Sequence, residues 1–208
     1  MLRCIFAVVL AMAVSVDLQS CAWAENFSTD PGQVPSGSYR MDTAHSQVLF
    51  SIVHLGMTNY YGRFDRLSGT LKFDSGQPEK SSVSVAIETA SIDTPSERLN
   101  DELKSTIVFA ADRFPSASFE SVSIVRTGYN TGRITGNLTI KGVTKPVTLD
   151  TVFTGSGNDL VSGAYAIGFH ASTTIKRSDF GLTGAIWDSL VSDDVKLIIE
   201  AMFEHEKE

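Results

Sequence analysis

The chain has 208 residues, of which 42% are hydrophobic, and its 17 basic against 24 acidic side chains give a net charge of −7 at neutral pH. An acidic chain is repelled by nucleic-acid phosphates and by anionic membranes, so we expect neither as a partner. The only two cysteines, Cys4 and Cys21, lie near the N-terminus, so the remainder of the chain has no disulfide, thiolate metal site or cysteine nucleophile.

The first 24 residues resemble an export signal. Met1-Leu2-Arg3 is a short basic start, residues 5–16 are almost entirely apolar, and Ala22-Trp23-Ala24 is a small-x-small cleavage site. We therefore predict a signal peptide over residues 1–24 and a mature chain that begins at Glu25. An alternative is a lipoprotein box at residues 18–21, which would leave a lipid anchor on Cys21, although Gln19 fits that box poorly. No later apolar segment approaches the roughly 20 residues of a membrane-spanning helix, so we expect no stable membrane insertion.

The rest of the chain reads as one domain of short strands. Residues 25–38 are rich in Gly, Pro and Ser and predict a flexible lead-in, so we expect the barrel domain to span residues 39–208. Apolar residues then recur at every second position in eight separate runs, beginning at Val48, Phe50 and Ile52. Turn-forming clusters separate the runs, at residues 74–78, 127–132, 141–142 and 155–159. Many short strands joined by short turns favour an all-β antiparallel sandwich or barrel.

One segment predicts a helix instead. Thr94 is a capping hydroxyl, Pro95 suits the first helical position, and Glu97 follows the cap by three residues. Leu99, Leu103 and Ile107 would form an apolar stripe that either closes an end of a barrel or packs outside a sheet. Arg98 lies beside that stripe, where its guanidinium would face either the barrel mouth or solvent.

Catalytic and metal motifs are weak. The histidines at positions 45, 54, 170 and 205 show no metal-ligand spacing, and no Gly-x-Ser-x-Gly elbow is present. His54 is interpreted as a hydrogen-bonded structural residue, with contact to a ligand headgroup as the alternative. We predict no catalytic residue, no metal ligand and no cofactor.

An ordered series of short motifs resembles the YceI family of bacterial lipid-binding proteins. It comprises Asp42-x-x-His45-Ser46-x-Val48-x-Phe50, His54-Leu55-Gly56, Gly62-Arg63-Phe64, Ser91-Ile92-Asp93-Thr94, Arg113-Phe114-Pro115, residues 136–147 and Arg177-Ser178-Asp179-Phe180-Gly181. The resemblance implies an extended antiparallel lipocalin-like β-barrel, with one or two short helices at an end, that binds a polyisoprenoid or fatty chain in the periplasm. Many members carry a histidine before the leucine of the helix, whereas this chain has Glu102 before Leu103.

The leading hypothesis is therefore an exported protein that holds an isoprenoid or fatty-chain lipid for carriage, storage or sequestration. The predicted ligand-binding residues are Val48, Phe50, Ile52, His54, Val85, Ile87, Arg98, Leu103, Phe119, Leu138, Ile140, Phe169 and Ala171. Two alternatives are a hydrolase or isomerase that uses a histidine and a carboxylate, and a ligand-free, stress-related structural barrel. The sequence leaves open whether the chain forms a homodimer.

Overall fold

The computed structural model describes residues 27–184 and 186–206. The predicted signal peptide, its cleavage site and Cys21 lie outside the described residues.

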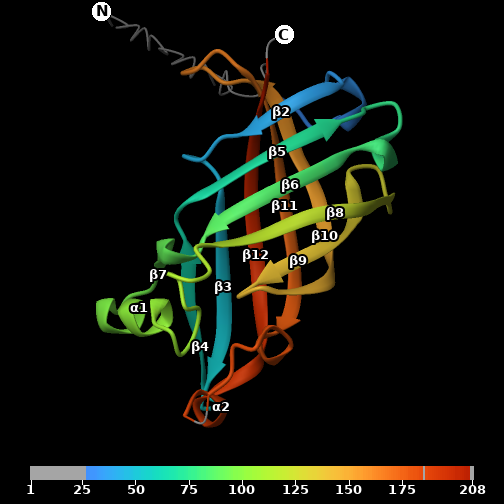
Figure 1. Ribbon diagram of the computed structural model, residues 1–208. Helices are drawn as coiled ribbons and strands as arrows, with labels where there is room; N and C mark the ends of the chain where they lie inside the picture. Colours follow the sequence, from blue (N-terminus) through green and yellow to red (C-terminus); the bar gives the residue numbers. More distant parts are fainter. Residues whose placement is uncertain (1–26, 185, 207–208) are drawn as a thin grey trace, which may run out of the picture.

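Strands dominate the described part of the chain (Figure 1). They are β1 (Phe27–Ser28), β2 (Gly37–Met41), β3 (Gln47–His54), β4 (Thr58–Phe64), β5 (Leu67–Phe73), β6 (Ser82–Glu88), β7 (Ile92–Asp93), β8 (Ser116–Arg126), β9 (Thr131–Ile140), β10 (Val143–Asn158), β11 (Tyr165–Lys176) and β12 (Val191–His205). The α-helices are α1 (Glu97–Lys104) and α2 (Trp187–Leu190), and the 3₁₀ turns are η2 (Pro31–Gln33), η3 (Pro78–Lys80), η4 (Thr89–Ser91) and η5 (Arg177–Phe180).

Eight of these strands close into an antiparallel barrel, which confirms the predicted fold class. The ring runs β2, β5, β6, β8, β9, β10, β11 and β12, and β12 pairs back onto β2. The long β12 has two partners on this side: residues 203–205 pair with β2, and residues 191–200 pair with β3. Strands β3, β4 and β7 therefore extend the wall beyond the closed ring, and Figure 1 shows β3 and β4 reaching the end occupied by α2.

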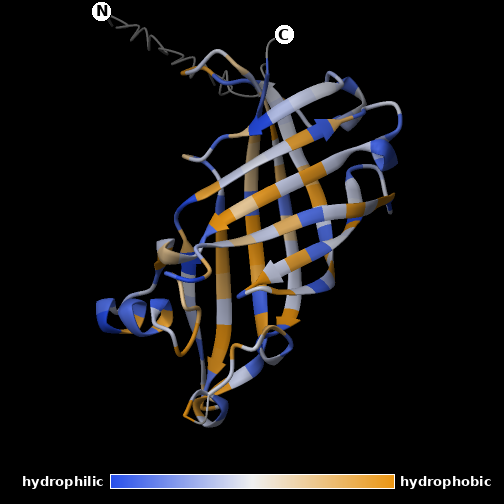
Figure 2. Cartoon of the chain, viewed as in Figure 1, coloured by the Kyte–Doolittle hydropathy of each residue, from blue (hydrophilic) through white to orange (hydrophobic). Residues whose placement is uncertain are grey.

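The apolar and polar residues that alternate in the sequence face the interior and the exterior of the barrel wall in turn. Successive side chains of a strand point to opposite faces, and Figure 2 shows apolar and polar residues alternating along the barrel strands. On β11, for example, Phe169 and Ala171 line the interior while His170 lies between them on the other face. Helix α1 is mostly polar in Figure 2 and lies beside β7, outside the closed ring.

The lead-in segment was expected to be flexible, but from residue 27 onward it packs on the barrel. Strand β1 pairs with the end of β10, and Val34 is only 2% exposed within a core cluster. The Tyr39 hydroxyl donates a hydrogen bond of 2.6 Å to the Pro35 carbonyl. The burial of Tyr39 raises its pKa to about 12. A few apolar side chains thus anchor a segment whose overall composition suggested flexibility.

Two local predictions were also wrong. Residues 155–158 belong to β10 and pair with β11, so the turn begins at Asp159, whose carboxylate accepts hydrogen bonds from the Val161 and Ser162 amides. Small residues suit this stretch, since β1 pairs along its other edge. The cap of α1 is Ser96, whose hydroxyl accepts from the Leu99 amide, rather than Thr94.

Candidate functional site

The barrel interior holds two chambers with apolar walls. The lower chamber, on the side of α1 and α2, has a volume of about 680 Å³, and the upper chamber, inside the closed ring, has about 240 Å³. An eight-stranded ring is just wide enough for side chains to fill. The larger volume therefore lies where β3, β4 and the helices form part of the wall.

All thirteen residues predicted to bind a ligand line one of these chambers. Nine line the lower chamber: Val48, Phe50, Ile52, His54, Ile87, Arg98, Leu103, Leu138 and Ile140. Four line the upper chamber: Val85, Phe119, Phe169 and Ala171. The sequence placed these residues in a single interior, whereas the structure distributes them between two chambers.

The lower chamber also has lining residues that the prediction missed. Ile175 and Leu197 belong to alternating runs and could have been chosen by the same rule. Trp187 and Leu190 belong to the short helix α2, where no periodic pattern marks them. Strand period identifies wall residues, but not the side chains that cap the wall.

Polar groups of the lower chamber belong to the segments at its edge. Arg98 is exposed on the first turn of α1, and within the described residues it forms no hydrogen bond or ion pair. His54 is half-buried at the end of β3, and in the same part of the chain its ring has no hydrogen-bond partner, so the structural reading of His54 is not supported. Both side chains are therefore available to a polar group of a ligand.

Arg177 holds the end of the lower chamber together. Arg177 is 8% exposed, and its guanidinium donates to the Ser192 carbonyl (3.0 Å), the Leu182 carbonyl (2.7 Å) and the Asp188 carboxylate (2.8 Å). Leu182 precedes α2, Asp188 lies within it and Ser192 follows it on β12, so one planar fork ties the capping segment to β12. The Arg177-Ser178-Asp179-Phe180-Gly181 motif is explained by this structural role.

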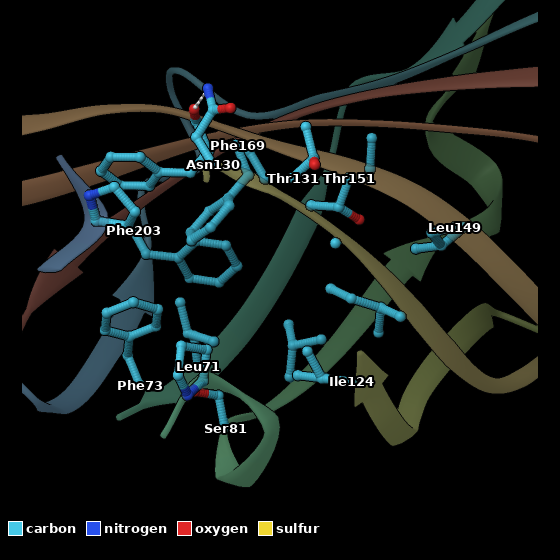
Figure 3. Close-up of a pocket in the computed structure, with 18 of the residues that line it drawn as sticks. Leu71, Phe73, Ser81, Ile124, Asn130, Thr131, Leu149, Thr151, Phe169 and Phe203 are labelled. Atoms are coloured by element: carbon cyan, nitrogen blue, oxygen red, sulfur yellow. Dashed lines mark hydrogen bonds between the residues drawn. The ribbon is translucent and has the colours of Figure 1, made fainter. Parts of the chain in front are cut away.

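The upper chamber is narrowed by aromatic rings (Figure 3). Phe169 contacts Phe153 and Phe203 in edge-on geometry, with ring centroids 5.7 and 6.4 Å apart. At the outer rim, a hydrogen bond from Tyr129 lowers the pKa of the Asp30 carboxyl. The rim is thus polar while the chamber behind it is apolar.

One histidine–carboxylate pair lies at the wall of the upper chamber. His170 Nδ1 lies 2.7 Å from Glu200 Oε1, and of the two residues only Glu200 lines the chamber. Among residues 27–184 and 186–206, no three His, Cys, Asp or Glu side chains are grouped so that they could hold a metal ion. No helix in these same ranges is long and apolar enough to cross a membrane.

Comparison with known proteins identifies the family. The profile of the YceI-like domain matches residues 39–203. The chain belongs to the YceI-like family. A UPF0312 protein of Ectopseudomonas mendocina is 39% identical over 170 residues, which cover 81% of this chain and 87% of that protein. A UPF0312 protein of Serratia proteamaculans is also 39% identical, with 81% and 86% covered.

Several solved structures share the fold of this chain. BcnA of Burkholderia cenocepacia superposes with a TM-score of 0.71 at 29% identity, covering 78% of this chain and 98% of BcnA. The Campylobacter jejuni YceI protein gives 0.65 at 31% identity, covering 75% and 91%. A polyisoprenoid binding domain from Saccharophagus degradans gives 0.61 at 18% identity, covering 83% and 100%, and at that identity it shows the fold alone.

Proposed function

We propose that this protein is a lipid-binding protein that holds a polyisoprenoid or another long apolar chain in the lower chamber. The observation that carries the proposal is the size and lining of that chamber. Its volume of about 680 Å³ falls within the range of about 300 to 1,000 Å³ that is typical of ligand sites. Strands β3, β6, β9, β11 and β12 all contribute apolar side chains to it.

The driving force would be burial of hydrocarbon. Each buried methylene group contributes about 0.8 kcal/mol, so about ten of them supply about 8 kcal/mol before the cost of association. Polar contacts are then needed only for orientation, and the exposed Arg98 and the half-buried His54 would give a headgroup its contacts at the edge. The Saccharophagus domain, which is described as polyisoprenoid binding and shares the fold, supports this class of ligand.

The proposal assigns carriage, storage or sequestration rather than catalysis, because neither His170 nor its partner Glu200 lines the lower chamber, where the ligand would lie. It also assigns export to the periplasm, on the basis of the N-terminal sequence. Intact mass of protein recovered from its natural host should correspond to a chain that begins at Glu25. A diacylglyceryl group on Cys21 would instead show a membrane-anchored lipoprotein.

Titration of delipidated protein with the isoprenoid alcohol geranylgeraniol tests the binding function. Trp187 lines the lower chamber, so its fluorescence should change saturably as the chain enters. Ile52→Glu would place a charge in the chamber wall and should lower the affinity at least tenfold. Val53→Glu is the matched control, because Val53 is the next residue of β3 and is 37% exposed. Absence of saturable binding, or equal loss in both variants, would refute a chain held in the lower chamber.

A further inference from the structure

The two chambers are separated inside one barrel. They share no lining residue, although they are built from the same strands. On β8, Phe119 lines the upper chamber and the next inward residue, Ala117, lines the lower one. On β12, Ile199 and Leu197 divide in the same way. On these two strands the boundary therefore lies within one inward step, at the level of Phe119.

The Phe119 ring occupies space at this level that another side chain would normally fill. Gly136 on β9 lies between Ile134 of the upper chamber and Leu138 of the lower chamber, and it carries no side chain. A Cβ atom on Gly136 would lie 2.4 Å from Cζ of Phe119, so the ring lies directly over the glycine. Phe119 is itself only 7% exposed.

The wall changes its strand composition close to this level, because Ile199 and Leu197 of β12 pair with β3 rather than with β2. Above this level, residues 203–205 of β12 pair with β2 in the closed eight-stranded ring, and such a ring is filled by ordinary side chains. Below it the wall is carried by β3, which runs from Val48 to His54, a length of about 20 Å at the strand rise. One aromatic side chain on β8 thus stands at the inner end of a long apolar space.

We propose that Phe119 is a specificity-determining residue that closes the inner end of the lower chamber and sets the longest apolar chain that the protein can bury. This inference rests on the proposed function. A chain that fits the lower chamber is buried completely, and additional isoprene units remain in water because the Phe119 ring blocks the upper chamber. Removal of the ring joins the two spaces into one tunnel.

The length dependence of binding tests the partition. Farnesol, geranylgeraniol and solanesol are isoprenoid alcohols of increasing length, and their affinities are measured by Trp187 fluorescence with each delipidated protein. For the wild type, affinity should rise from farnesol to geranylgeraniol and then stop rising. For Phe119→Ala, solanesol should bind at least tenfold more tightly than it binds the wild type, while farnesol affinity stays within about twofold. Phe119→Leu, a milder truncation, should give an intermediate gain.

Phe169→Ala is the matched control. Phe169 is an aromatic residue of the upper chamber, so its truncation enlarges that chamber without opening the partition, and the preference for length should not change. The inference is wrong if wild-type affinity continues to rise up to solanesol, if both Phe119 variants keep the wild-type length profile, or if Phe169→Ala gives the same gain. If no isoprenoid alcohol binds the wild type, the proposed function itself fails, and the inference fails with it.

Discussion

Ala117→Phe tests whether the lower chamber is a space for a ligand. Ala117 is 9% exposed on β8, lines the lower chamber, and pairs across the sheet with Ile87. In a solidly packed core, a phenyl ring at this position would force its neighbours off their rotamers at a cost of about 1 to 3 kcal/mol. In a chamber of about 680 Å³ the ring occupies empty volume instead.

The expected magnitudes can be derived from the same geometry. A phenyl ring in the chamber would cover about 100 Å² of apolar wall that a ligand would otherwise contact, which is worth about 2.5 kcal/mol at about 25 cal/mol per Å². Affinity for geranylgeraniol should therefore fall by at least tenfold, which corresponds to about 1.4 kcal/mol. The thermal midpoint of the delipidated protein should stay unchanged or rise, because the ring gains apolar contacts without displacing any side chain.

Ala166→Phe is the matched control for this substitution. Ala166 is 5% exposed and lines neither chamber, so the same ring should be overpacked there. Its thermal midpoint should fall by about 2 to 12 °C, given about 2 to 4 °C per kcal/mol for a chain of this size. Calorimetry of delipidated proteins and Trp187 fluorescence titration provide both readouts. A clear fall in the midpoint of Ala117→Phe with unchanged affinity would show that the interior is packed at this point.

Four further substitutions test separate features of the structure. Arg98→Ala should weaken the binding of geranylgeranyl phosphate by about 1 to 3 kcal/mol, because a charge-assisted contact is lost. Binding of the hydrocarbon squalene should be unaffected in the same titration. Equal loss of affinity for both ligands would assign Arg98 a structural role. Arg177→Met leaves several acceptors unpaired and should lower the free energy of unfolding by about 2 to 3 kcal/mol. Calorimetry should show this as a thermal midpoint lowered by about 4 to 12 °C, and an unchanged midpoint would contradict the role given to Arg177. The hydrogen bond with Asp42 raises the pKa of His45. The contribution of this pair to stability is therefore complete below about pH 6.5 and is lost as the pH rises through the raised pKa. Asp42→Asn should destabilise the protein more at about pH 5.5 than at about pH 8.5 in urea unfolding, and the opposite order would refute the coupling. Val34→Ala should lower the free energy of unfolding by about 1.6 kcal/mol, for two lost methylene equivalents; no change in the urea midpoint would mean that the lead-in adds nothing to the core.

The period of the strands made much of the wall predictable. Because the pleat fixes alternate side chains on one face, Phe50 and Ile52 could be assigned to the interior without coordinates. Small polar residues were misread where tertiary context determined their conformation. Gly155 and Gly157 were read as turn residues, yet β10 continues through them because partner strands lie on both sides.

The division of the interior could not be predicted from strand period. It depends on β12 pairing with β2 along one part and with β3 along another, which widens the space at one end. It also depends on the ring of Phe119 lying over Gly136, a contact between neighbouring strands that alternation does not specify. Trp187 was missed for a similar reason, since α2 is a single short turn without a hydrophobic pattern.

The most direct test of the central proposal is to identify what the protein carries. Protein purified from its natural host without detergent is extracted with organic solvent, and the extract is analysed by mass spectrometry, with Ile52→Glu prepared in parallel. We expect a polyisoprenoid or other long-chain lipid in nearly stoichiometric amount with the wild type, and its loss from the variant. A wild-type protein that releases no long-chain lipid, and that does not take one up when it is offered, would contradict the account.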